Sequence, residues 1–146
     1  MRLWHIDLLP YLPELQFKGQ LRELVAIMHD WRDKGKTNHL LINKVMEYEK
    51  DELTRYFYIY GKEYRNRYDT FPQKQWEKLR SFAGYGPPFF ECNIFENWHN
   101  KEYLRVCMAN LYEKHFFGVG KSRITDEEWE TLCRGYKEIT GEEYVI

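Results

Sequence analysis

Two groups near the start of the sequence could carry out nucleophilic chemistry together. The chain begins with Met1, and a terminal α-amine has a pKa of about 7.7–8.0, against about 10.4 for a lysine side chain. At neutral pH a larger fraction of such an amine is therefore unprotonated and able to react. The carboxylate of Glu23 follows Arg22, with Gly19 about one turn earlier on an expected helix. An amine beside a carboxylate can attack an electrophilic carbon and form a Schiff base.

Each part of this pattern also has an ordinary structural interpretation. A pair such as Arg22 and Glu23 is usually an exposed face of a helix. Glycine inside a helix costs about 0.8–1.0 kcal/mol relative to alanine. Gly19 therefore either packs against a neighbouring element or lets another backbone or a ligand come close to Glu23. Taken together with the family motif described next, the amine, the carboxylate and the glycine favour a functional site.

The residues around these groups resemble a known family. The segment MRLWHIDLLPYLPELQFKGQLREL is similar to the start of the pyrimidine dimer DNA glycosylases, small phage and bacterial repair enzymes of the endonuclease V type. The bacterial branch opens with Met-Arg-Leu-Trp-His and carries Gly-Gln-x-Arg-Glu on its first helix. Both motifs occur here, as Met1–His5 and Gly19–Glu23. A weaker likeness at Glu102–Phe116 extends the resemblance along most of the chain.

This resemblance implies a mechanism and the residues that perform it. The α-amine of Met1 would attack C1′ of a damaged nucleotide and displace the base. Glu23 would stabilise the cationic sugar intermediate and assist the β-elimination that cuts the strand, an AP-lyase activity. Three basic residues would bind DNA phosphates near the lesion: Arg2, Arg22 and Lys114. The partner would be damaged double-stranded DNA, bound by a monomer that uses no cofactor and no metal ion.

The chain departs from the phage pattern at several positions. Arg2 is too bulky for the usual removal of an initiating methionine, so we expect Met1 to remain and to supply the amine. Ala26 and Asn110 stand where the phage enzyme has arginines. Each phosphate neutralised on duplex DNA contributes about 0.9 to the slope of log affinity against log salt. The two replacements therefore predict weak DNA binding with a shallow dependence on salt.

Composition bounds the class of protein. A chain of 146 residues with 31% charged and 43% hydrophobic residues is typical of one globular domain. Its net charge of −1 provides no overall attraction to nucleic acid, so any DNA-binding surface must be local. No apolar run reaches the length of a membrane span, and no signal peptide is visible. We expect a cytoplasmic location, at the bacterial nucleoid or in a phage-infected cell. Three widely spaced cysteines suit buried positions in a reducing compartment.

Apolar spacing and helix start and stop signals predict an all-α fold. We expect a single compact domain over residues 1–146, with about five helices and an N-terminal segment packed between them. Because of two early prolines, residues 1–12 are predicted to be extended or irregular. The helices are predicted from Pro13 to Lys34, from Lys50 to Tyr68, from Phe71-Pro72 to Gly84, from Lys101 to Phe117, and from a capping box at Thr125 and Glu128 to Gly141.

Some features leave alternatives open. The second helix carries an aromatic stripe that is predicted to be core rather than a base-stacking platform, formed by Leu53, Tyr56, Phe57, Tyr60 and Tyr64. The whole chain could also be a non-catalytic nucleic-acid- or protein-binding domain that keeps the fold. In a third interpretation the N-terminal motif is purely structural, with Trp4 and Leu8 fastening the chain start to the core.

Overall fold

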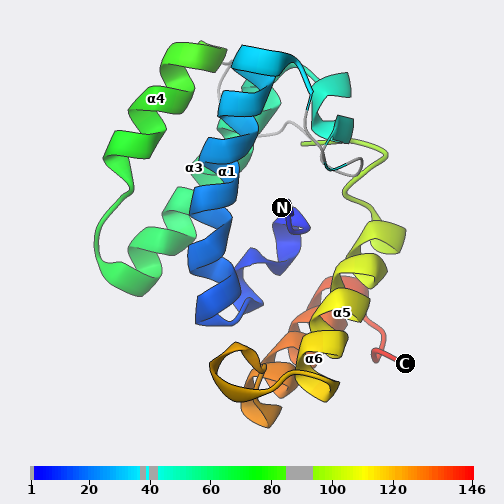
Figure 1. The fold of residues 1–146 in the computed structure, drawn as a ribbon. Coiled ribbons are helices and arrows are strands. Elements are labelled where there is room, and N and C mark those ends of the chain that lie inside the picture. The colour runs from blue at the N-terminus through cyan, green and yellow to red at the C-terminus, as the bar shows by residue number, and fades with distance from the viewer. Residues whose placement is uncertain (1, 37–38, 40–42, 85–93) are drawn as a thin grey trace. The chain divides into compact units, whose positions relative to one another are not determined.

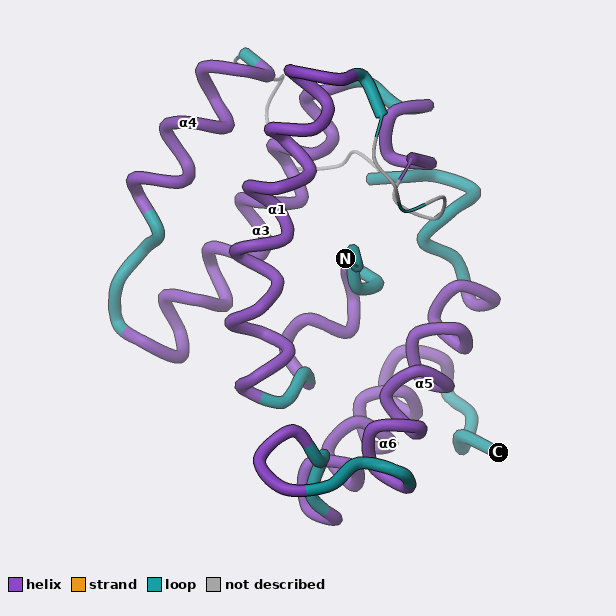
Figure 2. The backbone as a smooth tube through the Cα atoms, in the orientation of Figure 1, coloured by secondary structure: helices purple, strands orange, loops and turns teal. Residues whose placement is uncertain are grey.

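The computed structural model describes residues 2–36, 39, 43–84 and 94–146. These residues form five α-helices and three short 3-10 helices, with no strand among them, which confirms the predicted all-α class (Figures 1 and 2). The chain divides into two compact units. The first comprises Met1–Leu3 and Gln20–Glu96, and the second comprises Trp4–Gly19 and Asn97–Ile146. The single domain therefore stays a prediction.

The first unit is built from three long helices. They are α1 (Glu14–Lys34, of which Gln20 onward belongs here), α3 (Lys50–Tyr68) and α4 (Gln73–Ala83), with the 3-10 helix η2 at Lys44–Glu47. In Figure 1, α4 runs beside the α1–α3 pair. The buried side chains include Leu24, Ile27 and Met28 of α1, Leu53, Tyr56, Phe57 and Tyr60 of α3, and Trp76 and Leu79 of α4. The aromatic stripe is therefore core, as predicted, with Tyr64 half-buried.

The second unit combines residues Trp4–Gly19 with the last two long helices. It contains η1 (Ile6–Tyr11), α5 (Lys101–Phe116), η3 (Gly120–Ser122) and α6 (Asp126–Thr140). Helix η1 packs on α6, where Gly135 leaves room for the ring of Tyr11, because a Cβ at position 135 would overlap that ring. The predicted capping box is present, since Thr125 accepts from the Glu128 backbone and Glu128 accepts from the Thr125 backbone.

One prediction for the chain start was wrong. Residues 6–11 were expected to be extended or irregular, but they form the 3-10 helix η1 with Pro10 inside it. The ring of His5 accepts from the Asp7 backbone N–H at 3.1 Å, and the His5 carbonyl accepts from Leu8 at 3.0 Å. A 3-10 turn of this length has no apolar periodicity that a sequence could display, and a short helix loses little when a proline removes one donor.

The five long helices otherwise begin and end within one or two residues of the predicted bounds. The sequence also predicts a short apolar stretch at Leu40–Ile42 and a loop at residues 85–88, and both lie outside the described residues, as does Cys92. Cys107 is buried and Cys133 is half-buried, as predicted. Across the described part of the chain, no helix is both long and apolar enough to cross a membrane.

Candidate functional site

The carboxyl group of Glu23 on α1 lies against the backbone of the chain start. Its Oε2 accepts a hydrogen bond from the backbone N–H of Arg2 at 3.0 Å. The side-chain nitrogen of Gln20 lies 3.5 Å from the same oxygen. Because residues three apart share one face of a helix, Gln20 and Glu23 both face Arg2. The backbone that comes close to Glu23 is that of Arg2, and the role of Gly19 stays a prediction.

Gln20 links the chain start to two helices. Its side chain has no exposed surface, and its Nε2 donates to the backbone carbonyl of Arg2 at 2.7 Å. Its Oε1 accepts from the hydroxyl of Tyr56 on α3 at 3.2 Å. The N–H of Arg2 is thus bonded to Glu23 and its C=O to Gln20. The position of Arg2 is fixed from both sides of its own backbone.

Apolar burial reinforces this attachment. Leu3, the next residue of the same unit, is fully buried. Burying a leucine side chain contributes about 1.5–3 kcal/mol. The hydrogen bonds of Arg2 are therefore not the only interactions that keep the chain start in place.

Burial also sets the proton affinity of the site. It is the largest cause that raises the pKa of Glu23 above its ordinary value of 4.5. The hydrogen bond from the Arg2 backbone and the positive charges of Arg2 and Arg22 oppose this rise, because they favour the ionised form. The balance leaves a half-buried carboxyl group that binds a proton more readily than an exposed glutamate. Such a group can exchange a proton or stabilise a nearby positive charge.

The residues predicted for the site differ in their surroundings. Met1 lies outside the described residues, and its role as nucleophile stays a prediction. Arg2 is half-buried beside Glu23. Arg22, the residue before Glu23 on α1, is exposed. Lys114 is exposed on α5 of the second unit, and its role in binding DNA also stays a prediction.

The sequence did not predict that Gln20 and Tyr56 contribute polar groups to this site. Gln20 was read only as part of a motif, and Tyr56 only as a core aromatic. A polar residue one turn before Glu23, on the face predicted to be functional, was the signal for Gln20. No comparable signal exists for the Tyr56 hydroxyl, because its partner lies 36 residues away in the chain.

In the part of the chain that is described, no cluster of three or more histidine, cysteine, aspartate or glutamate side chains could hold a metal ion. The chemistry that the geometry offers is that of one carboxyl group, one carboxamide and one phenol around the backbone of Arg2.

Comparison with known proteins gives one match. Residues 1–75 match the family model described as pyrimidine dimer DNA glycosylase. No curated protein and no solved structure matches the chain. The matched half contains every member of the hydrogen-bonded group, namely Arg2, Gln20, Glu23 and Tyr56. Asn110 and Lys114 lie beyond it.

Proposed function

Because the chain belongs to the pyrimidine dimer DNA glycosylase family, we propose that it excises a damaged base from DNA and then cuts the strand at the same nucleotide. In this proposal the nucleophile is the α-amine of Met1, and Glu23 is the assisting carboxylate. The lesion is a pyrimidine dimer or a related damaged pyrimidine, and the same centre acts on an abasic site. The DNA substrate follows from the family, whereas the amine chemistry is our inference.

The observation that carries the proposal is the 3.0 Å hydrogen bond from the Arg2 backbone N–H to Glu23 Oε2. Three covalent bonds, with a total length of about 4.3 Å, separate the nitrogen of Arg2 from the α-nitrogen of Met1. Whatever the conformation of that residue, covalent geometry keeps the two nitrogens within this distance. The amine therefore stays within about 7.3 Å of the Glu23 oxygen. A sugar carbon bound at the amine would lie within reach of the carboxylate.

The chemistry balances as a covalent mechanism. The lone pair of the neutral amine forms a bond to C1′ while the bond from C1′ to the base breaks, and the base keeps that electron pair and takes up a proton. The amine then loses a proton, and the bond from C1′ to the ring oxygen O4′ opens with protonation of that oxygen, which leaves a Schiff base. Loss of a proton from C2′ breaks the bond from C3′ to its phosphate oxygen. Water finally hydrolyses the Schiff base and releases the amine.

Glu23 suits two of these steps. Its ionised form stabilises the positive charge that develops on the sugar and on the Schiff base. Its raised pKa makes it a better proton acceptor than an ordinary glutamate, which supports a role in removing the C2′ proton. The hydrogen bond from Arg2 keeps the carboxyl group oriented during both steps.

The guanidinium groups of Arg2 and Arg22 and the amine of Lys114 are proposed to bind phosphates around the lesion. Charge-assisted hydrogen bonds from guanidinium to phosphate are short and roughly twice as strong as neutral ones. Arg22 is exposed, which leaves its side chain accessible to DNA.

The test is reductive trapping on a defined duplex. Protein whose first residue has been verified as Met1 by mass spectrometry is mixed with abasic-site DNA and borohydride, which reduces a Schiff base to a stable adduct. We expect an adduct and strand cleavage with the free terminus, and neither when a tag blocks the amine. Equal cleavage by tagged and untagged protein would contradict the proposal. Absence of binding and of cleavage with a free terminus would favour the non-catalytic alternative.

A further inference from the structure

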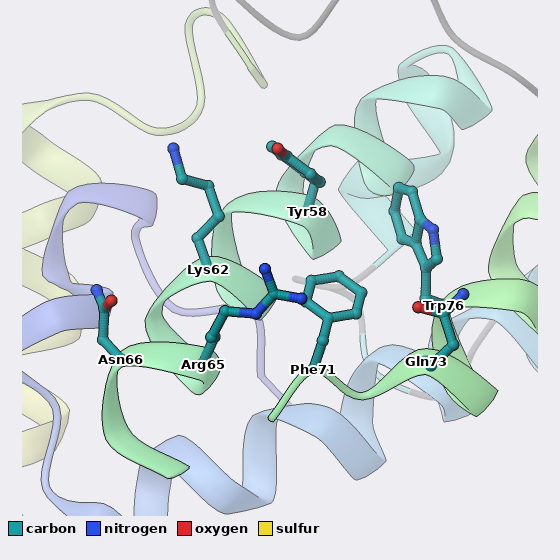
Figure 3. Close-up of a pocket in the computed structure, with 7 residues that line it drawn as sticks. All are labelled: Tyr58, Lys62, Arg65, Asn66, Phe71, Gln73 and Trp76. Atoms are coloured by element: carbon teal, nitrogen blue, oxygen red, sulfur yellow. The ribbon is translucent and has the colours of Figure 1, made fainter. Parts of the chain in front are cut away.

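The first unit also contains a pocket lined by aromatic, basic and carboxamide side chains. This pocket lies between α3 and α4 and has a volume of about 400 Å³ (Figure 3), a size within the range of small-ligand sites. Its lining combines three aromatic rings, two cations and two carboxamides, from Tyr58, Lys62, Arg65, Asn66, Phe71, Gln73 and Trp76. No carboxylate belongs to this lining.

The aromatic rings adjoin one another and form a wall whose ring planes meet at 48° between Tyr58 and Trp76 and at 86° between Phe71 and Trp76. The centroid of Trp76 lies 6.0 Å from that of Tyr58 and 6.0 Å from that of Phe71. Gly61 makes room for Phe71 against α3, because a Cβ at position 61 would overlap the Phe71 ring. Trp76 is only 8% exposed, so its side chain packs into the core of the unit and fixes its place in this wall.

Each of the two cations lies over one ring of the same wall. The amine of Lys62 is 5.9 Å from the centre of the Tyr58 ring, and the guanidinium carbon of Arg65 is 5.6 Å from that of Phe71. Among the ion pairs between described residues, none includes Lys62 or Arg65. Their charges are therefore available to a ligand. Figure 3 shows both side chains extending from α3 on the side where the three rings lie.

The charge of the surrounding helices supports an anionic ligand. Residues 50–83 hold eight lysines and arginines against five aspartates and glutamates, a net charge of +3, although the whole chain carries −1. Of the neighbouring carboxylates, Glu63 forms an ion pair with Arg67, and Glu77 accepts a hydrogen bond from the neutral amide of Gln73. The α3–α4 segment is thus a local basic surface in a chain without overall positive charge.

The pocket is separate from the Glu23 site. On α3, Tyr58, Gly61, Lys62 and Arg65 follow the spacing of a single helix face. Tyr56, which bonds to Gln20, is two residues from Tyr58 and so points about 200° away around the helix. The body of α3 therefore lies between the pocket and the carboxyl group proposed for catalysis.

We propose that this pocket binds an unpaired nucleotide, with its base against the Tyr58–Trp76–Phe71 wall and its phosphate on Lys62 and Arg65. Bases stack on aromatic side chains whatever their sequence. The carboxamide nitrogens of Asn66 and Gln73 donate to Glu63 and Glu77, and their oxygens can accept from the edge of the base. A paired base inside a duplex is stacked between its neighbours and cannot enter. The ligand is either a free mononucleotide or an unpaired nucleotide of a single DNA strand. This inference goes beyond the proposed excision, because the bound nucleotide is not the one that reacts.

Binding is tested with full-length protein and a short, undamaged, 5′-phosphorylated oligothymidylate labelled at its 3′ end, followed by fluorescence anisotropy. We expect the double variant Lys62→Gln/Arg65→Gln to lose at least tenfold in affinity, and its salt slope to fall by about 0.7 for each phosphate that the variant no longer neutralises. Tyr58→Leu should weaken binding similarly. The control Lys74→Gln/Lys78→Gln removes the same charge from α4 outside the pocket lining and should change affinity less than twofold.

Competition identifies the source of the nucleotide. If thymidine monophosphate displaces the oligonucleotide, the pocket accepts free nucleotides; if only an unlabelled single strand competes, it accepts a nucleotide within a strand. Inorganic phosphate that competes as well as thymidine monophosphate would contradict base stacking. Equal losses in the pocket and control variants, or no binding to the intact protein, would overturn the proposal. Because the probe is undamaged and Glu23→Gln should bind it normally, this outcome is independent of the excision chemistry.

Discussion

Gln20 donates a 2.7 Å hydrogen bond from its fully buried side chain to the backbone carbonyl of Arg2. This bond and the one from the Arg2 backbone N–H to Glu23 attach the backbone of Arg2 to α1. Holding a reacting group in the correct position can lower the activation free energy of a reaction by a large amount. The attachment of Arg2 is therefore expected to matter for rate as well as for stability.

Gln20→Leu tests this attachment. Leucine fills a similar volume but leaves the Arg2 carbonyl and the Tyr56 hydroxyl without the bonds that Gln20 provides. An unsatisfied buried polar group costs about 1–3 kcal/mol, so we expect a lower free energy of unfolding and slower trapping of abasic DNA. Tyr56→Phe is the matched control, because it removes the hydroxyl that bonds to Gln20 Oε1 and keeps the aromatic ring. It should cost about 0.5–1.5 kcal/mol with trapping little changed. Equal trapping by both variants would show that Gln20 does not position the amine.

Glu23→Gln tests the carboxylate itself. The amide oxygen can still accept from the Arg2 backbone, so folding and DNA binding should survive. Loss of the charge should lower single-turnover cleavage of abasic DNA by about 10²–10⁴-fold, the usual size of such contributions. Glu47→Gln, on an exposed position of η2, is the control and should cleave normally. A decrease of less than threefold in the folded variant would remove Glu23 from the mechanism.

The raised pKa of Glu23 also predicts how stability depends on pH. Below pH 4.5 the group is protonated in both the folded and the unfolded chain. As pH rises from 4.5 through the folded pKa, the unfolded chain releases its proton first, so the free energy of unfolding falls. Glu23→Gln lacks this decline and should be more stable than the wild type at neutral pH, with the difference shrinking toward pH 4. Thermal unfolding across this range measures it. A difference that does not vary with pH would contradict the buried-carboxyl assignment.

The replacements at positions 26 and 110 predict weak DNA binding. Ala26 has no charge, and the side-chain amide of Asn110 donates to the Val106 carbonyl of its own helix at 2.9 Å. We expect a shallow salt dependence and more efficient cleavage of abasic sites than of pyrimidine dimers, because an abasic site is easily extruded. Asn110→Arg should steepen the slope of log affinity against log salt by about 0.9. Ala109→Arg adds the same charge at the neighbouring exposed position and is the control. A steep wild-type slope with efficient dimer cleavage would show that other cations replace the arginines.

Much of this architecture could be predicted from local patterns. The apolar spacing of α1 and α3 and the capping box of α6 indicated the helices, because these signals act within one or two turns. The η1 helix escaped prediction because a 3-10 turn has no such period. Gln20 could be placed on the right face of α1, but its bonds to Arg2 and Tyr56 depend on tertiary packing. The same is true of the pocket, whose rings come from two helices and the loop between them.

The aromatic residues illustrate that limit. The stripe that contains Tyr56 and Tyr60 was predicted to be core, and it is. The surface with stacking rings is formed instead by Tyr58, Phe71 and Trp76, which share no periodic pattern in the sequence. Only the fold brings them beside Lys62 and Arg65.

In the proposed mechanism, the α-amine of Met1 reacts with the sugar of the damaged nucleotide. The most direct measurement is to digest the borohydride-trapped adduct with protease and nuclease and to locate the modified residue by mass spectrometry. We expect a sugar remnant on the α-nitrogen of the N-terminal peptide that starts at Met1, and no adduct when that amine is blocked. A remnant on a lysine side chain, with Met1 unmodified, would contradict it.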